Sequence, residues 1–255
     1  MLSNAYDDSE KGEYALSASR IRAERYRQFN HIEFNFVEIN RLLDQGRQQY
    51  NYSQFQEALS SLQQSLDLYR ENENCASRNH LLEYQVVFLL GDAHRILGRY
   101  QEALDFFEQS LSISREINNL YVEAWALQTL GLVYHDLGQY DRALELHQES
   151  LTIARELKDL SIESSALHNI GLAYYWLGQY ERAVEYLNQA LSTARMAEDK
   201  HAEMHALGNL GLTYSFLGQH ELSLELLEQS IRIAREVGAL RIEAAFTGNL
   251  GFSYR

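Results

Sequence analysis

The sequence of 255 residues contains no proline and a single cysteine, Cys75. Proline breaks helices, so its absence favours long helices joined by short turns. A lone cysteine cannot form an internal disulfide, and we expect it in a reducing cytoplasm. The sequence also lacks an 18-residue apolar run and an apolar signal core at its N-terminus. Neither a membrane span nor a secretory leader is therefore expected.

Basic residues are also scarce. The chain has 22 Lys and Arg against 36 Asp and Glu, which gives a net charge of −14 at pH 7. Nucleic acids and anionic membranes attract basic surfaces, so neither is an expected partner. The one basic cluster, Arg20, Arg22, Arg25 and Arg27, is interrupted by Glu24. We interpret this cluster as a solvated helix face.

The motifs of common catalytic and cofactor sites are absent. The sequence contains neither GxGxxG nor GxxxxGK[ST], which hold phosphates, and no nucleophile elbow. His201 and His205 have the i, i+4 spacing of a helical zinc site, but Glu203 is one place too late for HExxH and no third ligand is indicated. We therefore expect no enzyme activity, no cofactor and no metal site.

What the sequence does contain is a 40-residue period. A leucine or isoleucine followed by glycine recurs at this step, in Leu90-Gly91, Leu130-Gly131, Ile170-Gly171, Leu210-Gly211 and Leu250-Gly251. A second glycine, then tyrosine and alanine, follows in Gly98, Tyr100 and Ala103, in Gly138, Tyr140 and Ala143, and in Gly178, Tyr180 and Ala183. The next unit keeps Gly218 but departs at His220 and Ser223. Self-similarity of this length predicts a solenoid of stacked helical hairpins.

These residues resemble the tetratricopeptide repeat family. The pattern is seen most fully in Leu130-Gly131, Tyr134, Gly138, Tyr140 and Ala143. The resemblance covers roughly residues 35–255 and implies an all-α, right-handed superhelical solenoid of antiparallel helix pairs. The period exceeds the usual 34 residues by about six, so the chain is most similar to the long-repeat type found in LGN and Pins adaptors, kinesin light chains and bacterial peptide sensors.

The period divides the chain into units. Residues 1–34 are expected to form an acidic tail and a capping helix, followed by five repeats and one helix of a sixth, at 35–78, 79–118, 119–158, 159–198, 199–238 and 239–255. Helix A of repeats one to five is predicted at about 35–50, 80–97, 120–137, 160–177 and 200–217. Helix B is predicted at about 54–70, 101–116, 141–156, 181–196 and 221–236. The polar stretch 71–77 takes up five extra residues, as a tolerated insertion or a contact loop.

The periodic small and charged residues have expected packing roles. Glycine in the middle of helix A and alanine early in helix B allow the two backbones to approach closely. In an antiparallel hairpin the start of helix A lies beside the end of helix B. We therefore expect Glu123 to pair with Arg155, and Glu163 with Arg195.

The resemblance also implies a binding groove lined by helix A. Five positions of each repeat would face it: six, three and two residues before the repeat glycine, and one and four after it. They include Asp92, Arg95, Trp125, Gln128, His135, His168, Asn169, Tyr175, His205, Asn209 and Asn249. An asparagine amide both donates and accepts, so the three asparagines could hold the backbone of an extended peptide of any sequence. Alternatively, Asn169 and Asn209 bond within or between helices.

The function expected on this basis is a non-catalytic scaffold that captures a protein or peptide segment in the groove. Large apolar residues such as Trp125 and Tyr175 suit hydrophobic anchors of the ligand. Three alternatives remain. The chain, which stops inside helix A of a sixth unit, could be the sensor portion of a larger signalling protein. It could also assemble with itself through its apolar C-terminal helix, or be an enzyme with a closed polar pocket.

Overall fold

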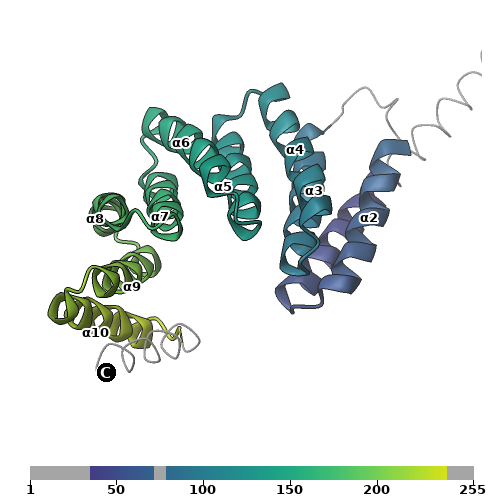
Figure 1. Ribbon diagram of the computed structural model, residues 1–255. Helices are drawn as coiled ribbons and strands as arrows, with labels where there is room; N and C mark the ends of the chain where they lie inside the picture. Colours follow the sequence, from purple (N-terminus) through teal and green to yellow (C-terminus); the bar gives the residue numbers. More distant parts are fainter. Residues whose placement is uncertain (1–34, 72–78, 240–255) are drawn as a thin grey trace, which may run out of the picture. The chain divides into compact units, whose positions relative to one another are not determined.

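The computed structural model describes residues 35–71 and 79–239. Within these ranges the chain forms helices joined by short turns, without any strand (Figure 1). The first helix covers residues 35–51. It is followed by α2 (Phe55–Glu71), α3 (His80–Ile96), α4 (Tyr100–Glu116), α5 (Leu120–Asp136), α6 (Tyr140–Leu157), α7 (Leu160–Trp176), α8 (Tyr180–Met196), α9 (Lys200–Phe216) and α10 (His220–Glu236).

The helix spans confirm the predicted alternation of helices A and B, and each boundary lies within one residue of its predicted place. The described residues fall into two compact units, of which the first ends at Ala93 and the second begins at His94. In the second unit every helix from α4 to α10 contacts the next one along the chain. The all-α solenoid class is thereby confirmed, whereas the right-handed superhelical path stays a prediction.

The turns from helix A to helix B depend on glycine. Gly98, Gly138, Gly178 and Gly218 have φ values of 72° to 74°, in the left-handed region that disfavours residues with a Cβ. A Cβ at these positions would meet no atom within 4 Å, so the backbone conformation and not the available space requires glycine. The N–H of Gly138 donates to the carbonyl of His135 at 2.9 Å and closes the end of α5.

The turns from helix B to helix A use a different device. Asn118, Lys158 and Glu198 adopt φ values of 52° to 55°, and the residue that follows each of them caps the next helix A. The Asp159 carboxylate, for example, accepts from the N–H groups of Ser161 and Ile162 at 3.0 and 2.9 Å. A side-chain cap satisfies backbone donors that a helix start would otherwise leave unpaired.

The repeat glycine permits close packing of helix A on helix B. A Cβ on Gly171 would lie 2.7 Å from Cγ of Leu187, and one on Gly131 would lie 2.5 Å from Cε1 of His147. The glycine therefore faces the residue sixteen positions later. Serine hydroxyls add a second link, because Oγ of Ser65, Ser150 and Ser230 each donates to a helix A carbonyl 26 residues earlier, at 2.8 to 2.9 Å.

One hydrophobic cluster runs through α6 to α10. It contains Leu151 of α6, Ile170 of α7, Leu187 of α8, Leu207 of α9 and Ile233 of α10, all buried. Each hairpin therefore shares its core with its neighbours, as expected where a single helix pair cannot bury its apolar face alone.

The predicted pairing of the periodic charges was wrong. Glu123 accepts from Arg115 at 2.7 Å and Glu163 accepts from Arg155 at 2.9 Å, so each glutamate pairs with the arginine eight residues before it. Arg195 and Glu203 repeat this pair at 2.8 Å. The turn from helix B to helix A is so short that the end of one repeat lies beside the start of the next. The ion pairs therefore join neighbouring repeats and do not close single hairpins.

Several expectations fall outside the described residues. These are the capping helix and the arginine cluster within residues 1–34, the predicted insertion at 71–77 apart from Glu71, and the helix of the sixth unit, which includes Asn249.

Candidate functional site

Most predicted groove positions lie along α5, α7 and α9 of the second unit, and Asp92 and Arg95 lie on α3. Most of them, including Trp125, Tyr175 and Asn209, are partly exposed, whereas Gln128 and Asn169 are buried. Gln128 is only 1% exposed and Asn169 only 8%. The helix A positions therefore form two groups, an accessible one and one that is buried between neighbouring helices.

Gln128 is the centre of a hydrogen-bond network between α5 and α7. Its Oε1 accepts from Ser165 Oγ at 2.6 Å and from Asn169 Nδ2 at 3.4 Å. Its Nε2 donates to the carbonyl of Ile162 at 3.3 Å. Buried amides require such partners because an unpaired one is costly. The Asn169 amide is thus engaged within the array.

His168 and Asn209 form the equivalent link between α7 and α9. Asn209 Nδ2 lies 2.7 Å from His168 Nε2. An amide nitrogen only donates, so Nε2 of this imidazole is the acceptor. Burial and the nearby His205 lower the pKa of His168 to about 4, which keeps its ring neutral at pH 7. The pKa of His205 is also lowered, chiefly by burial and then by His201.

Charged groups lie at the ends of the predicted face. In the second unit Arg95 donates to Asp136 at 3.2 Å, and His135 Nδ1 lies 3.8 Å from the same carboxylate. Burial raises the pKa of Asp136, but His135 and Arg95 more than offset this, so the pKa is lowered overall. In the first unit Tyr50 donates its hydroxyl proton to Asp92. These predicted site residues are also engaged within the fold.

The accessible group is mainly apolar and aromatic. Trp125, Leu132, Leu172, Tyr175 and Leu212 are partly exposed at groove positions. Side chains of this kind anchor ligands by burying area at little entropic cost. These side chains form the apolar part of the predicted site that is accessible to solvent.

Neither a metal centre nor a membrane span is found in the described ranges. No three His, Cys, Asp or Glu side chains within residues 35–71 and 79–239 lie close enough together to hold a metal ion. Over the same residues, every helix falls short of the length and apolarity that crossing a bilayer requires.

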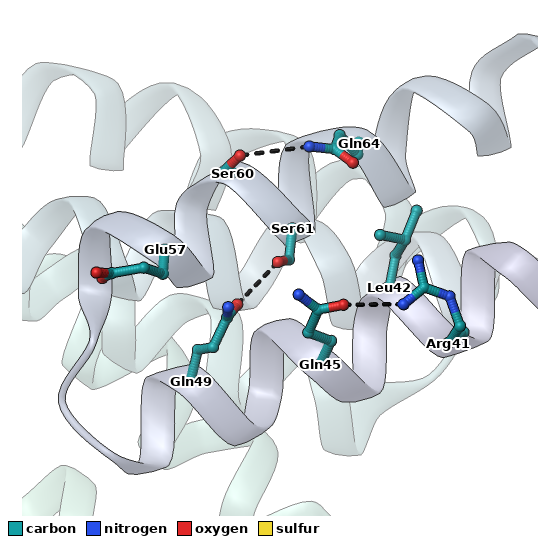
Figure 2. A pocket seen from close by; sticks show the side chains of 8 residues that line it. All are labelled: Arg41, Leu42, Gln45, Gln49, Glu57, Ser60, Ser61 and Gln64. Carbon is teal, nitrogen blue, oxygen red and sulfur yellow. Dashed lines mark hydrogen bonds between the residues drawn. The ribbon is translucent and has the colours of Figure 1, made fainter.

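The first unit contains a polar cleft of about 300 Å³ between the 35–51 helix and α2 (Figure 2). It is lined by Arg41, Leu42, Gln45, Gln49, Glu57, Ser60, Ser61 and Gln64. Gln49 accepts from Ser61 at 2.8 Å, and Gln45 accepts from Arg41 at 3.0 Å.

The repeat register explains why this cleft is polar. Gln45, Gln49 and Ser61 hold the places of Ile170, Tyr174 and Tyr186, which pack in the core cluster of repeat four. A polar replacement of core positions is typical of a capping face. We therefore interpret the cleft as a polar face of the first hairpin and not as a ligand site.

His147 is a buried polar residue on the apolar stripe of α6 and is not one of the predicted site residues. It holds the place of Leu187 and Leu227, is fully buried, and has no partner among the described residues for either ring nitrogen. Burial, then the nearby His135 and His168, lower its pKa to about 3. Its departure from leucine in the repeat alignment was the available signal.

Family models of the tetratricopeptide repeat match residues 84–156 and 163–236, and another matches residues 43–116. The chain belongs to the tetratricopeptide repeat family. Among curated protein sequences, none matches this tetratricopeptide repeat chain.

Solved structures similar to this tetratricopeptide repeat protein support the same fold. A kinesin light chain-type protein of Podosopora anserina, with nearly identical TPR-like repeats, is 22% identical, with 79% of this chain and 96% of that chain covered and a TM-score of 0.64. A Rap protein in complex with competence and sporulation factor is 16% identical, with 82% and 57% covered and a TM-score of 0.72. A STAND protein with a tetratricopeptide repeat sensor from Pyrococcus horikoshii is 19% identical, with 84% and 32% covered and a TM-score of 0.69. At these identities the likeness concerns the fold.

Proposed function

We propose that this protein is a non-catalytic, cytoplasmic scaffold that binds a peptide segment of a partner protein along the helix A positions of α5, α7 and α9. The observation that carries the proposal is the partly exposed row of Trp125, Leu132, Leu172, Tyr175 and Leu212 on successive helices A. Two Rap proteins with this fold are described in complex with a peptide or with competence and sporulation factor. An open row of anchors suits an extended or helical segment.

The asparagines have an indirect role in this proposal. Asn169 and Asn209 bond to Gln128 and His168, so they hold adjacent helices A in register. The ligand then meets a preorganised surface, which lowers the entropic cost of binding.

A second candidate is the sensor portion of a larger signalling protein. The chain spans about 57% of a Rap protein and 32% of the STAND protein to which it is similar. In this role the same row would bind the ligand, and the response would come from another part of the protein. Sequencing the complete reading frame distinguishes the two candidates.

The test is a selection of peptides from a random display library on the full chain, followed by fluorescence anisotropy with the enriched peptide. We expect Trp125→Ala with Leu172→Ala to weaken binding at least tenfold, with unchanged helicity by circular dichroism. Gln148→Ala, on the exposed side of α6, is the matched control and should bind as the parent does. Loss of binding in the control but not in the double variant would overturn the proposal.

A further inference from the structure

Five aromatic side chains at the helix ends of repeats three to five form a connected group, which we name the aromatic belt. Tyr140 and Tyr180 begin α6 and α8, Tyr175 and Trp176 end α7, and Phe216 ends α9. Tyr175 holds one of the five predicted groove positions, and the large apolar residues expected as ligand anchors also include Trp176 and Phe216. The belt therefore adjoins the helix A face and extends beyond it.

The belt is built from two stacked pairs and a ring that joins them. Tyr140 stacks on Trp176 with an interplanar angle of 10° at 6.3 Å, and Tyr180 stacks on Phe216 at 22° and 5.2 Å. Tyr175 meets Trp176 at 87° and Phe216 at 84°, with ring centroids 5.5 Å apart in both contacts. Trp176 and Phe216 are the outer rings of the belt. Because Tyr175 contacts both of them, they are held in fixed orientations.

The two outer rings remain open to solvent although they are stacked. Trp176 is 56% exposed and Phe216 is 61% exposed. The fold does not require aromatic residues here, because Asp136 holds the equivalent place at the end of α5 and forms an ion pair with Arg95. Large exposed rings that the fold does not need indicate an interaction surface.

The charge around the belt indicates what it binds. Residues 94–239 contain 21 acidic and 11 basic side chains. Two of these arginines lie over aromatic rings, Arg142 at 5.9 Å from the Tyr134 centroid and Arg182 at 5.3 Å from the Tyr174 centroid, and both rings lie outside the belt. The belt thus presents exposed aromatic rings in a unit with a net negative charge, a combination that favours a cationic ligand.

We propose that the aromatic belt binds an arginine-bearing segment of a partner protein, with guanidinium groups stacked on the exposed rings of Trp176 and Phe216. Arginine suits this surface better than lysine because its planar, weakly hydrated head group stacks on rings. The acidic excess of the unit attracts the segment over a longer range. The inference rests on the proposed scaffold function, since it names the chemistry of one part of the captured segment.

The test uses the full chain and a fluorescein-labelled peptide with four arginines spaced by glycine and serine. A peptide of equal charge with four lysines is the comparison. We expect the arginine peptide to bind at least fivefold more tightly in fluorescence anisotropy. Trp176→Ala with Phe216→Ala should weaken its binding at least tenfold and abolish the preference over lysine. Tyr121→Ala with Met196→Ala, which removes exposed apolar side chains from other helix ends, should change neither.

Each contrary result overturns a defined part of the proposal. Equal binding of the arginine and lysine peptides would mean that charge alone acts, and the belt would have no specific role. A further variant replaces the chain's own arginine cluster with glutamine, at Arg20, Arg22, Arg25 and Arg27. If this variant binds the peptide more tightly than the parent does, the chain's own arginines occupy the belt. If the belt variant keeps full affinity for a library-selected peptide that Trp125→Ala with Leu172→Ala no longer binds, the belt proposal is wrong while the scaffold proposal stands.

Discussion

Nε2 of His168 lies 2.7 Å from Nδ2 of Asn209, and the two residues are 41 positions apart. Gln128 and Asn169 have the same separation and the same contact, at 3.4 Å. In each case, the side chain three residues before the glycine of one repeat forms a hydrogen bond with the side chain two residues before the glycine of the next repeat. The polar groove positions therefore connect neighbouring helices A.

The first prediction concerns this link. Asn209→Ala should lower the free energy of unfolding by about 1–2 kcal/mol, because it leaves a buried imidazole nitrogen without its donor. His168→Ala made in the same background should then cost less than it does in the parent protein. Urea denaturation followed by circular dichroism measures the coupling. Strict additivity would show that the two side chains do not interact in solution.

The second prediction concerns the repeat glycine. Gly171→Ala places a methyl group 2.7 Å from Cγ of Leu187, so we expect a loss of about 1–3 kcal/mol from overpacking. Leu187→Ala alone should cost about 2–5 kcal/mol because it leaves a cavity. The double variant should be more stable than the sum of the two losses predicts, since the new methyl group fills part of that space. Thermal unfolding of all four proteins tests this, and an unchanged midpoint for Gly171→Ala would contradict the close contact.

The third prediction distinguishes the observed ion pairs from those expected from the sequence. Arg155→Gln and Glu163→Gln should each cost less than about 1 kcal/mol, because the arginine is half exposed and surface pairs contribute little. A double-mutant cycle should nevertheless give a coupling for Arg155 with Glu163 that falls as salt is added. The cycle for Arg155 with Glu123 should give none. A coupling between Arg155 and Glu123, without one between Arg155 and Glu163, would instead support the pairing within a hairpin that the sequence led us to expect.

The fourth prediction concerns pH. The pKa of His147 is about 3 in the folded protein and near 6.5 when unfolded, so the unfolded chain takes up a proton first as pH falls. The free energy of unfolding should therefore be highest above pH 6.5 and should fall below that pH. For this one residue the fall is up to about 1.4 kcal/mol per pH unit. His168, with a pKa of about 4, acts in the same direction.

His147→Leu is the direct test of the pH prediction. Leucine occupies the equivalent place beside Gly171, so it fits, and it should raise stability at pH 7.5 and lessen the loss at pH 5.0. Denaturant midpoints at the two pH values give both quantities. A variant with the parent's pH dependence would show that other groups control it.

The sequence predicted the helices closely because their signals are local and repeated. Gly138 and Gly178 mark turns through backbone conformation alone, so their spacing revealed the helix ends. The partners of side chains were harder to predict, because they depend on how one repeat lies on the next. Glu163 was expected to reach Arg195 but contacts Arg155 across a short turn. Burial of Gln128 and Asn169 likewise depends on the spacing between helices A, which a single unit of sequence does not specify.

The ion pairs Arg155–Glu163 and Arg195–Glu203 join consecutive repeats through the same atoms at nearly the same distance, 2.9 and 2.8 Å. A junction that is repeated so closely is interchangeable. An in-frame duplication of residues 160–199 would place Arg195 beside a copy of Glu163 and would keep the cap provided by Asp199 at the new boundary. Recombination within the gene could therefore lengthen the array one unit at a time while keeping this ion pair and this helix cap at every new boundary.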